Sequence, residues 1–198
     1  ALVTAANENR LTVWSSHEQE KQAIQGTGLS GAVGGDDGAT PHIGVYLSDA
    51  ASTKMEYYLD FGSFASSVRC LAGGIQELRT TTDLTSDAPL NAKNLPVAVT
   101  GDGKYTPRGT MNIIVRIYSP FGGGFTSVRV NGKEQTVYAD RYLGRNVTRV
   151  QLQIKPGQSY TITTSMISGK GQTKDAVLST TPGVQPTRND VVIPSACH

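Results

Sequence analysis

The stretch "HIGVYLSDAASTKMEYYLDF" (residues 42–61) decides how the fold of this sequence is interpreted. Apolar or aromatic residues occupy every second position in both of its halves, at Ile43, Val45 and Leu47 and then at Met55, Tyr57, Leu59 and Phe61. A period of two is typical of strands that bury one face. We therefore expect two adjacent strands and interpret the polar residues 48–54 as the loop that joins them. This loop is longer than the commonest hairpin turns.

The same period continues to the end of the chain. Further strand candidates are "SFASSVRC" (63–70), "IQELRTTTDLTS" (75–86), "LPVAVT" (95–100), "MNIIVRIYS" (111–119), "TSVRVNGKEQTVYA" (126–139), "NVTRVQLQIKPGQSYTITTSM" (146–166) and "DAVLSTTP" (175–182). Asn131-Gly132 is a strong hairpin signal, because both central residues of a type I′ turn take positive φ. Pro156-Gly157 suits a type II turn. These features predict a mainly β protein, an antiparallel β-sandwich over residues 42–198.

The first part of the chain has a different pattern. We interpret "RLTVWSS" (residues 10–16) as a short strand, and Ser15 with Glu18 three residues later fits a capping box at the start of a helix. A glycine-rich loop, "GTGLSGAVGGDDGATP", then leads to the sandwich. The opening "ALVTAANENR" resembles the tail of a helix, so we expect residues 1–35 to form a short N-terminal segment of helix tail, strand and helix. This segment would belong to a domain upstream of the given sequence.

Composition excludes two classes of partner. The net charge is +2 and the 18 Lys and Arg residues are scattered, whereas nucleic-acid binding calls for a basic stripe with interleaved aromatic residues. No run approaches the roughly 20 apolar residues of a membrane helix. We therefore expect no nucleic acid as a partner and no membrane span in this chain.

The two cysteines, Cys70 and Cys197, lie far apart and form no C-x-x-C motif. They are either two unrelated buried thiols or a disulfide. The disulfide is favoured because packing alone rarely buries a residue so near the end of a chain. It would be worth about 4–5 kcal/mol in the chain-entropy model, and it implies an oxidising, extracytoplasmic compartment.

Candidate catalytic groups do not assemble into a known pattern. Ser52 and Lys54 lack the S-x-x-K spacing that places both side chains on one helix face. His17, His42 and His198 fall in different expected elements and show no metal-binding spacing. We predict no catalytic residue and no cofactor, although a triad of distant residues stays open as an alternative.

Two loops raise the alternative of a bound ion. Asp36, Asp37 and Asp102 offer hard oxygen ligands within glycine-rich loops, but the D-x-D-x-D-G spacing of a calcium loop is absent. Asp-Gly in a loop is more often only a turn, so no metal is predicted and a loop calcium stays an alternative. "ISGKGQT" (residues 167–173) lacks the first glycine of a phosphate loop and lies between strands, so it is rejected.

Aromatic residues outside the strands give the best candidate for a contact surface. Tyr105, Phe121 and Phe125 lie in expected loops, where we do not expect the apolar core to bury their side chains. The remaining candidates for stacking on sugars are Trp14, Tyr46, Tyr57, Tyr58, Tyr118, Tyr138, Tyr142 and Tyr160. Most of these lie in strands, where aromatic residues are enriched for packing reasons. We therefore predict ligand binding through the three loop residues.

A family resemblance is carried by several stretches in order: "NRLTVWSSHEQEKQAI", "IGVYLSDAASTKMEYYLDF", "LPVAVTGDG", "TPRGTMNIIVRIYSP" and the terminal "PSAC". Together they resemble the C-terminal part of an actinobacterial surface-protein family, the domain of unknown function 4012 family. The resemblance covers nearly the whole chain and is most specific over residues 10–61. It implies membrane-anchored proteins of the cell envelope whose upstream region is faintly similar to glycopolymer transferases of the LytR-CpsA-Psr type. It supplies no catalytic residues, and it supports the pairing of Cys70 with Cys197.

Three hypotheses about function follow. The favoured one is a non-enzymatic extracellular module at the cell surface, which supports or presents an upstream domain of the same polypeptide. The second is a glycan-binding module for cell-wall or surface polysaccharide. The third is an enzyme, for which a pocket gathering His42, Asp49 and Lys54 would be the sign.

Overall fold

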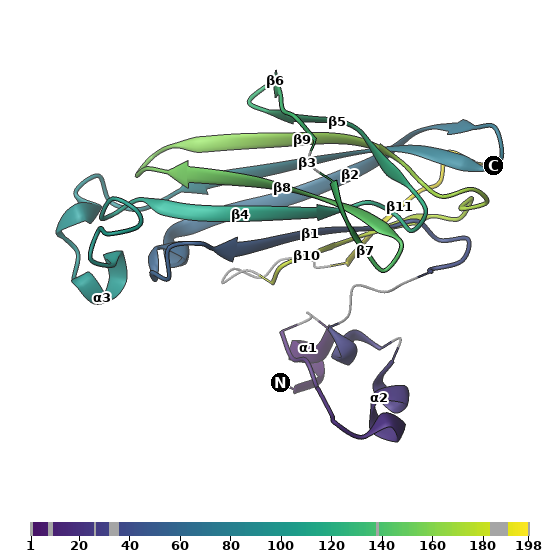
Figure 1. The fold of residues 1–198 in the computed structure, drawn as a ribbon, viewed down its shortest axis with the longest axis horizontal. Coiled ribbons are helices and arrows are strands. Elements are labelled where there is room, and N and C mark those ends of the chain that lie inside the picture. Colours follow the sequence, from purple (N-terminus) through teal and green to yellow (C-terminus); the bar gives the residue numbers. More distant parts are fainter. Residues whose placement is uncertain are drawn as a thin grey trace.

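Two β-sheets packed face to face make up most of the structure, a computed structural model that describes residues 2–7, 10–25, 27–31, 36–137, 139–182 and 190–197 (Figure 1). Short N-terminal helices lie beside the sheets, below β1 and β10 in the view of Figure 1. The prediction of a mainly β sandwich with a short N-terminal helical segment is confirmed.

The helices are short and the strands are long. The helices α1, α2 and α3 span Leu2–Asn7, Glu18–Ile24 and Val97–Thr100, and 3-10 turns span Gly28–Ser30, Met55–Tyr58 and Ala92–Asn94. The strands are β1 (His42–Asp49), β2 (Leu59–Leu71), β3 (Ile75–Ser86), β4 (Met111–Tyr118), β5 (Gly124–Val130), β6 (Lys133–Glu134), β7 (Ala139–Tyr142), β8 (Arg145–Ile154), β9 (Ser159–Ile167), β10 (Ala176–Thr180) and β11 (Asp190–Ile193).

The strands form a six-stranded sheet in the order β11-β10-β1-β4-β8-β7 and a five-stranded sheet in the order β2-β3-β9-β5-β6. All pairs in the described residues are antiparallel except β1 with β10, where His42 lies opposite Val177 in a parallel register. After β9, the chain passes from the five-stranded sheet back to the six-stranded sheet. There β10 lies on the side of β1 away from β4 and runs in the same direction as β1. The sandwich is therefore mixed in one pair and not wholly antiparallel.

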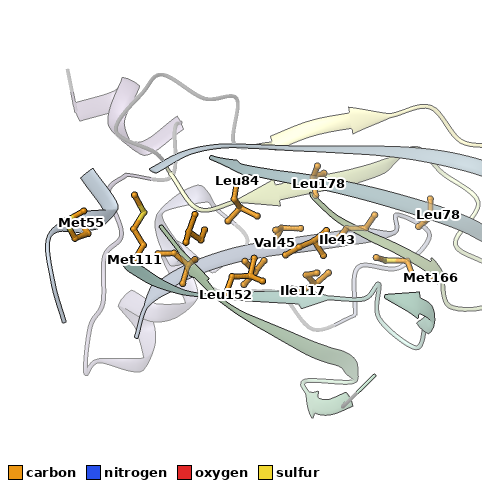
Figure 2. Packing of buried hydrophobic residues seen from close by; sticks show 14 of the residues in the cluster. Ile43, Val45, Met55, Leu78, Leu84, Met111, Ile117, Leu152, Met166 and Leu178 are labelled. Carbon is orange, nitrogen blue, oxygen red and sulfur yellow. The ribbon is translucent and has the colours of Figure 1, made fainter. Parts of the chain in front are cut away.

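The core lies between the inner faces of the two sheets (Figure 2). Alternate positions of each strand supply its buried apolar side chains, as the period of two predicts. The six-stranded sheet contributes Ile43, Val45, Ile113, Val115, Ile117, Leu152 and Leu178, and the five-stranded sheet contributes Leu78, Leu84, Ile162 and Met166.

Buried threonines share the inner face of the five-stranded sheet with these apolar residues. Thr80 on β3 and Thr164 on β9 are buried and hydrogen-bond to each other through their hydroxyls. The hydroxyl of Thr82 lies 2.9 Å from that of Ser63 on β2. These three threonine hydroxyls thus have partners, which avoids the cost of unsatisfied polar groups at their positions, whereas the buried Ser86 hydroxyl at the end of β3 has none among the described residues.

The predicted pair of adjacent strands over residues 42–61 is wrong in two respects. Met55–Tyr58 form a 3-10 turn in which Met55 is buried and Tyr57 is exposed, and β2 begins only at Leu59. The connection after β1 also crosses from the six-stranded to the five-stranded sheet, so β1 and β2 do not pair. Alternation alone cannot distinguish a hairpin from a crossing between sheets, because both bury the same side chains.

Two further strand predictions are wrong. Residues 97–100 of "LPVAVT" form α3, with Pro96 at its N-cap, where the missing amide hydrogen of proline costs nothing. Residues 10–16 form no strand, since no neighbouring strand is available to pair with them. The capping box is also absent: His17 is the N-cap of α2, and the Ser15 hydroxyl accepts a hydrogen bond from the His17 amide (3.0 Å).

Both predicted turns form. Asn131 and Gly132 have φ of 48° and 77°, as a type I′ turn between β5 and β6 requires. At Pro156-Gly157, the amide of Gln158 donates to the carbonyl of Lys155 (3.0 Å) and Gly157 has φ of 71°. This second turn links β8 to β9 and therefore joins the two sheets rather than two paired strands.

The end of the glycine-rich loop already belongs to the sandwich. The carbonyls of Ala39 and Pro41 accept hydrogen bonds from the amides of Lys174 (3.0 Å) and Val177 (2.8 Å). A boundary between residues 35 and 42 stays a prediction. Among the described residues, no helix is long and apolar enough to cross a lipid bilayer.

Candidate functional site

The polar stretch between β1 and β2 is organised around the carboxylate of Asp49. Its Oδ1 accepts a hydrogen bond from the amide of Ala51 (2.9 Å), and its Oδ2 accepts one from the amide of Thr53 (2.7 Å). The amide of Lys54 donates to the carbonyl of Val99 (2.9 Å), which fixes the loop against α3. The Asp49 carboxylate therefore holds the crossing between the sheets, and its acceptor positions are engaged in the fold.

The aspartates of the two candidate calcium loops are also engaged locally. Asp36 Oδ1 accepts from the amide of Gly38 (2.8 Å), and Asp102 Oδ1 accepts from the amide of Lys104 (2.9 Å), which are side-chain turns of the Asx type. Asp37 forms an ion pair with Arg145 instead. Among the described residues, no three His, Cys, Asp or Glu side chains come together as a metal site.

Arg145 is the largest fully buried side chain of the described structure, with 1% of its surface exposed. Its Nη1 donates to the carbonyls of His42 (2.7 Å) and Ser119 (3.2 Å), and its Nη2 donates to the carboxylate of Asp37. This one guanidinium thus connects β8, the start of β1, the end of β4 and the segment before the sandwich. No pattern in the sequence indicated its role, because its partners are 26 to 108 residues away in sequence.

The residues of the enzyme hypothesis do not gather. His42 and Asp49 are the first and last residues of β1, so their backbones are roughly 23 Å apart at about 3.3 Å per residue. The His42 Nε2 lies 2.6 Å from the Ser179 hydroxyl on β10. His17 is exposed beside α2, and His198 lies outside the described residues.

The three predicted ligand-binding aromatic residues do not share a groove. Tyr105 is 75% exposed in the loop before β4, and the Lys104 ammonium lies 5.4 Å from its ring centroid. Phe121 follows β4 at the opposite end of that strand and packs on Gly144, where a Cβ would lie 2.2 Å from its ring. Phe125 packs against the core. Tyr105 is therefore the one exposed residue of the three, and Phe121 and Phe125 are half-buried.

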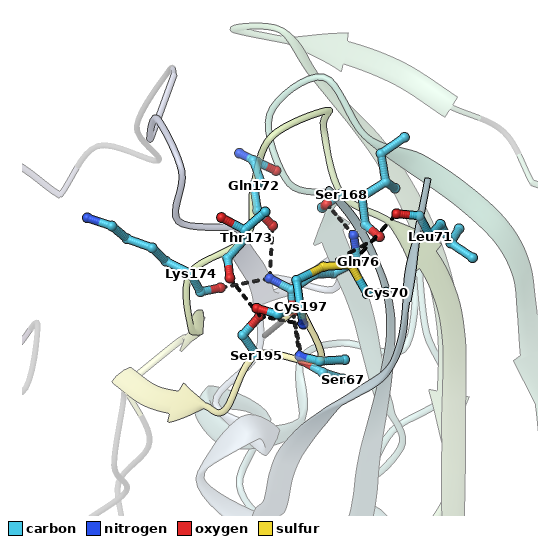
Figure 3. The surroundings of a disulfide bond; sticks show 12 residues. Ser67, Cys70, Leu71, Gln76, Ser168, Gln172, Thr173, Lys174, Ser195 and Cys197 are labelled. Atoms are coloured by element: carbon cyan, nitrogen blue, oxygen red, sulfur yellow. Dashed lines mark hydrogen bonds between the residues drawn. A yellow bond between two sulfur atoms is a disulfide. The ribbon is translucent and has the colours of Figure 1, made fainter. Parts of the chain in front are cut away.

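The predicted disulfide joins Cys70 on β2 to Cys197, with a Cα–Cα distance of 4.9 Å (Figure 3). Beside it, the buried Gln76 side chain is saturated with hydrogen bonds. Its Nε2 donates to the carbonyls of Gln172 (2.9 Å) and Lys174 (2.7 Å), and its Oε1 accepts from the amide of Ala196 (3.3 Å). The C-terminal segment is thus held by one covalent bond and by this buried amide.

The outer face of the six-stranded sheet carries a connected row of tyrosines. The Tyr46 and Tyr118 rings meet edge to face with centroids 5.6 Å apart, and the Tyr118 and Tyr142 rings do the same at 6.1 Å. Tyr142 is 50% exposed. These residues come from β1, β4 and β7. They are among the candidates for stacking on sugars that the sequence analysis ranked below the three loop residues. We call this surface the tyrosine face: Tyr46, Tyr118 and Tyr142, with the strand positions between them.

Two arginines lie beside this row in direct register. Tyr46 on β1 is opposite Arg116 on β4, and Arg116 is opposite Arg149 on β8. Cross-strand partners point to the same side of a sheet, so all three side chains share the tyrosine face. Arg116 Nη1 donates to the Ser48 hydroxyl (2.8 Å). Neither arginine forms an ion pair with a carboxylate of the described residues.

A strained turn lies at the edge of the same face. Leu143 and Gly144 form the two-residue turn between β7 and β8, and Leu143 has φ of 46° while being 56% exposed. Left-handed backbone costs an ordinary L-residue roughly 1–2 kcal/mol, and Asn or Gly usually occupies such positions. The turn therefore carries backbone strain at an exposed position.

No family model matches the chain, and no curated protein matches it. Among solved structures, the chain is similar to an M1 zinc metallopeptidase from Deinococcus radiodurans, with a TM-score of 0.27 and 8% identity over 74% of this chain and 32% of that chain. A mutant of that enzyme bound to a Tyr-Ser-Ala substrate gives a TM-score of 0.26 and 9% identity over the same shares. The chain spans about a third of these proteins, and so low a similarity carries no argument about activity.

Proposed function

We propose that the chain is a non-enzymatic accessory module of an extracytoplasmic cell-envelope protein, which supports an upstream domain of the same polypeptide. The observation that carries this proposal is the engagement of its polar side chains within the fold. Asp49, Arg145 and Gln76 each hold chain segments together rather than line a shared site. The Cys70–Cys197 disulfide supports an oxidising compartment, as does the resemblance to the domain of unknown function 4012 family.

The test is made in the longer polypeptide on cells. Removal of residues 36–197 should lower the amount of the upstream domain at the cell surface. Lys54→Ala should leave that amount and any associated phenotype unchanged, because the variant keeps the backbone amide that donates to the Val99 carbonyl. If Lys54→Ala abolished a cellular phenotype of the longer polypeptide while the melting temperature of the protein stayed the same, the result would argue for chemistry at this loop and against the accessory role.

We propose glycan binding as a second candidate function, favoured by the tyrosine face. Aromatic rings in a connected row, one exposed and two half-buried, offer apolar surface with polar edges, which suits the alternating apolar and hydroxyl faces of sugars. Tyr142 contributes the most exposed ring of that row. The loops that carry Tyr105, Phe121 and Phe125, which the sequence predicts to bind a ligand, are a competing location for the same function.

Co-sedimentation with purified cell-wall sacculi and surface polysaccharide distinguishes the two locations. Tyr142→Ala should reduce saturable binding, while Tyr105→Ala should not, although both remove an exposed tyrosine ring. The reverse pattern would move the site to the loop before β4. If neither the parent nor any variant bound saturably, glycan binding would be rejected and the accessory role would be the one proposal that remains.

A further inference from the structure

We propose that the tyrosine face binds an acidic polysaccharide, with Arg116 and Arg149 receiving its carboxylate or phosphate groups. This inference rests on the glycan-binding candidate and adds the chemical class of the ligand. Both anions present oxygen pairs that match the planar fork of a guanidinium. The two arginines would set the charge of the ligand, and the tyrosines would contact its sugar rings.

The first support is the register of the two arginines. Arg116 and Arg149 occupy directly opposite positions on β4 and β8, and like charges placed there destabilise a sheet. Neither is neutralised by a described carboxylate at ion-pair distance. A ligand anion between them would relieve the repulsion, so the arrangement is more favourable in a complex than in the free protein.

The second support is the contrast between Arg116 and Arg149 and those arginines of the described sandwich that form ion pairs. Arg145 is paired with Asp37 and two backbone carbonyls, Arg69 with Glu77, and Arg129 with Glu134. Arg149 is exposed on the face and has no such partner in the described structure. Among the described residues, Arg149 thus has no ion-pair partner, and Arg116 has only the uncharged Ser48 hydroxyl as its hydrogen-bond partner.

The third support is the immediate neighbourhood of the pair. Tyr46 lies opposite Arg116, and Tyr118 lies two positions along β4 on the same face. The carboxylate on this face nearest in register is Asp140 on β7, which lies opposite Val147 and thus in the neighbouring row towards the sheet edge. A chain that passes along the row of Tyr46, Arg116 and Arg149 meets two cations and an aromatic ring without an opposing carboxylate in that row.

The binding experiment uses the 198-residue chain and three soluble polymers. Polygalacturonate carries carboxylates, its fully methyl-esterified form is the neutral control, and poly(glycerol phosphate) carries phosphodiesters. We expect binding to at least one acidic polymer, weaker binding to the ester, and loss of affinity as salt is raised, because exposed charge interactions are screened. Preference between the two acidic polymers decides whether carboxylate or phosphate supplies the charge.

Matched variants test whether the two arginines form the site. Arg116→Gln and Arg149→Gln should each lower affinity roughly tenfold or more, the usual worth of a charge-assisted hydrogen bond. Arg79→Gln removes the same charge from an exposed position of β3 on the other sheet and should leave affinity unchanged. Arg116→Lys keeps the charge but loses the planar fork, and should fall between the parent and Arg116→Gln. Melting temperatures confirm that each variant is folded.

The outcomes separate this inference from the glycan-binding candidate. Equal binding of acid and ester, insensitive to both arginines, would keep glycan binding and overturn the acidic ligand. Equal losses in Arg79→Gln and Arg149→Gln would reduce the effect to net charge and overturn the site. Binding of no polymer, neutral or acidic, would overturn both.

Discussion

Replacing Asp37 by alanine should lower the free energy of unfolding by about 3 kcal/mol, because it strips the buried Arg145 guanidinium of its counter-ion. Removal of one partner from a buried ion pair typically costs about 3–5 kcal/mol. The lower end applies here, since Arg145 keeps hydrogen bonds to the carbonyls of His42 (2.7 Å) and Ser119 (3.2 Å). For a chain of this length, about 3 kcal/mol corresponds to a fall of about 6–12 °C in melting temperature.

Asp36→Ala is the matched control for this prediction. It removes a neighbouring carboxylate and changes the net charge equally, but Asp36 accepts only the exposed hydrogen bond from the Gly38 amide (2.8 Å) among the contacts of its side chain. Its loss should cost about 1 kcal/mol or less. Urea denaturation of the parent and both variants gives the free energies. A difference of less than about 0.5 kcal/mol between the two variants would refute the structural role assigned to Arg145.

Three further predictions concern stability. Gln76→Ala should cost about 3 kcal/mol, because it leaves the buried carbonyl of Gln172 and the part-buried carbonyl of Lys174 without their partner. Gln153→Ala at an exposed position of β8 should cost about 0.5 kcal/mol or less, and equal costs in urea denaturation would contradict the buried network. Changing Cys70 and Cys197 together to serine should lower the free energy of unfolding by about 2–5 kcal/mol. Thiol labelling of the unreduced, unfolded parent should find no free thiol, and two labelled thiols would exclude the disulfide. Leu143→Asn should raise the melting temperature by relieving about 1 kcal/mol of left-handed strain, and a loss of stability would show that Leu143 is held by packing.

Local alternation and turn chemistry account for the parts of the fold that the sequence predicted well. Residues 75–86 form β3 over the predicted range because Leu78, Thr80, Thr82 and Leu84 alternate inward without interruption. Asn131-Gly132 forms its turn because these residues tolerate positive φ. The cysteine pairing was also predicted, from the position of Cys197 near the end of the sequence.

Long-range pairing accounts for what the sequence did not reveal. Met55 and Tyr58 both pack on the core from a 3-10 turn, where residues three apart lie together, so the spacing of the strand pattern misled the prediction. The hairpin at Leu143-Gly144 was missed because leucine is unusual at a left-handed position. The tyrosine face could not be predicted either, since Tyr46, Arg116 and Arg149 become neighbours only through the strand order β1-β4-β8.

The most direct test of the proposed polysaccharide binding at the tyrosine face is an NMR titration of the isotopically labelled chain with trigalacturonate. A short glycerol phosphate oligomer replaces it if poly(glycerol phosphate) binds better than polygalacturonate. The structure predicts that the largest shifts of backbone and side-chain signals fall on Tyr46, Arg116, Tyr118 and Arg149. Residues of the five-stranded sheet, such as Arg79 and Thr163, should stay unchanged. Shifts concentrated around Tyr105 and the loop before β4, or spread evenly over exposed Lys and Arg, would contradict the assignment of the binding face.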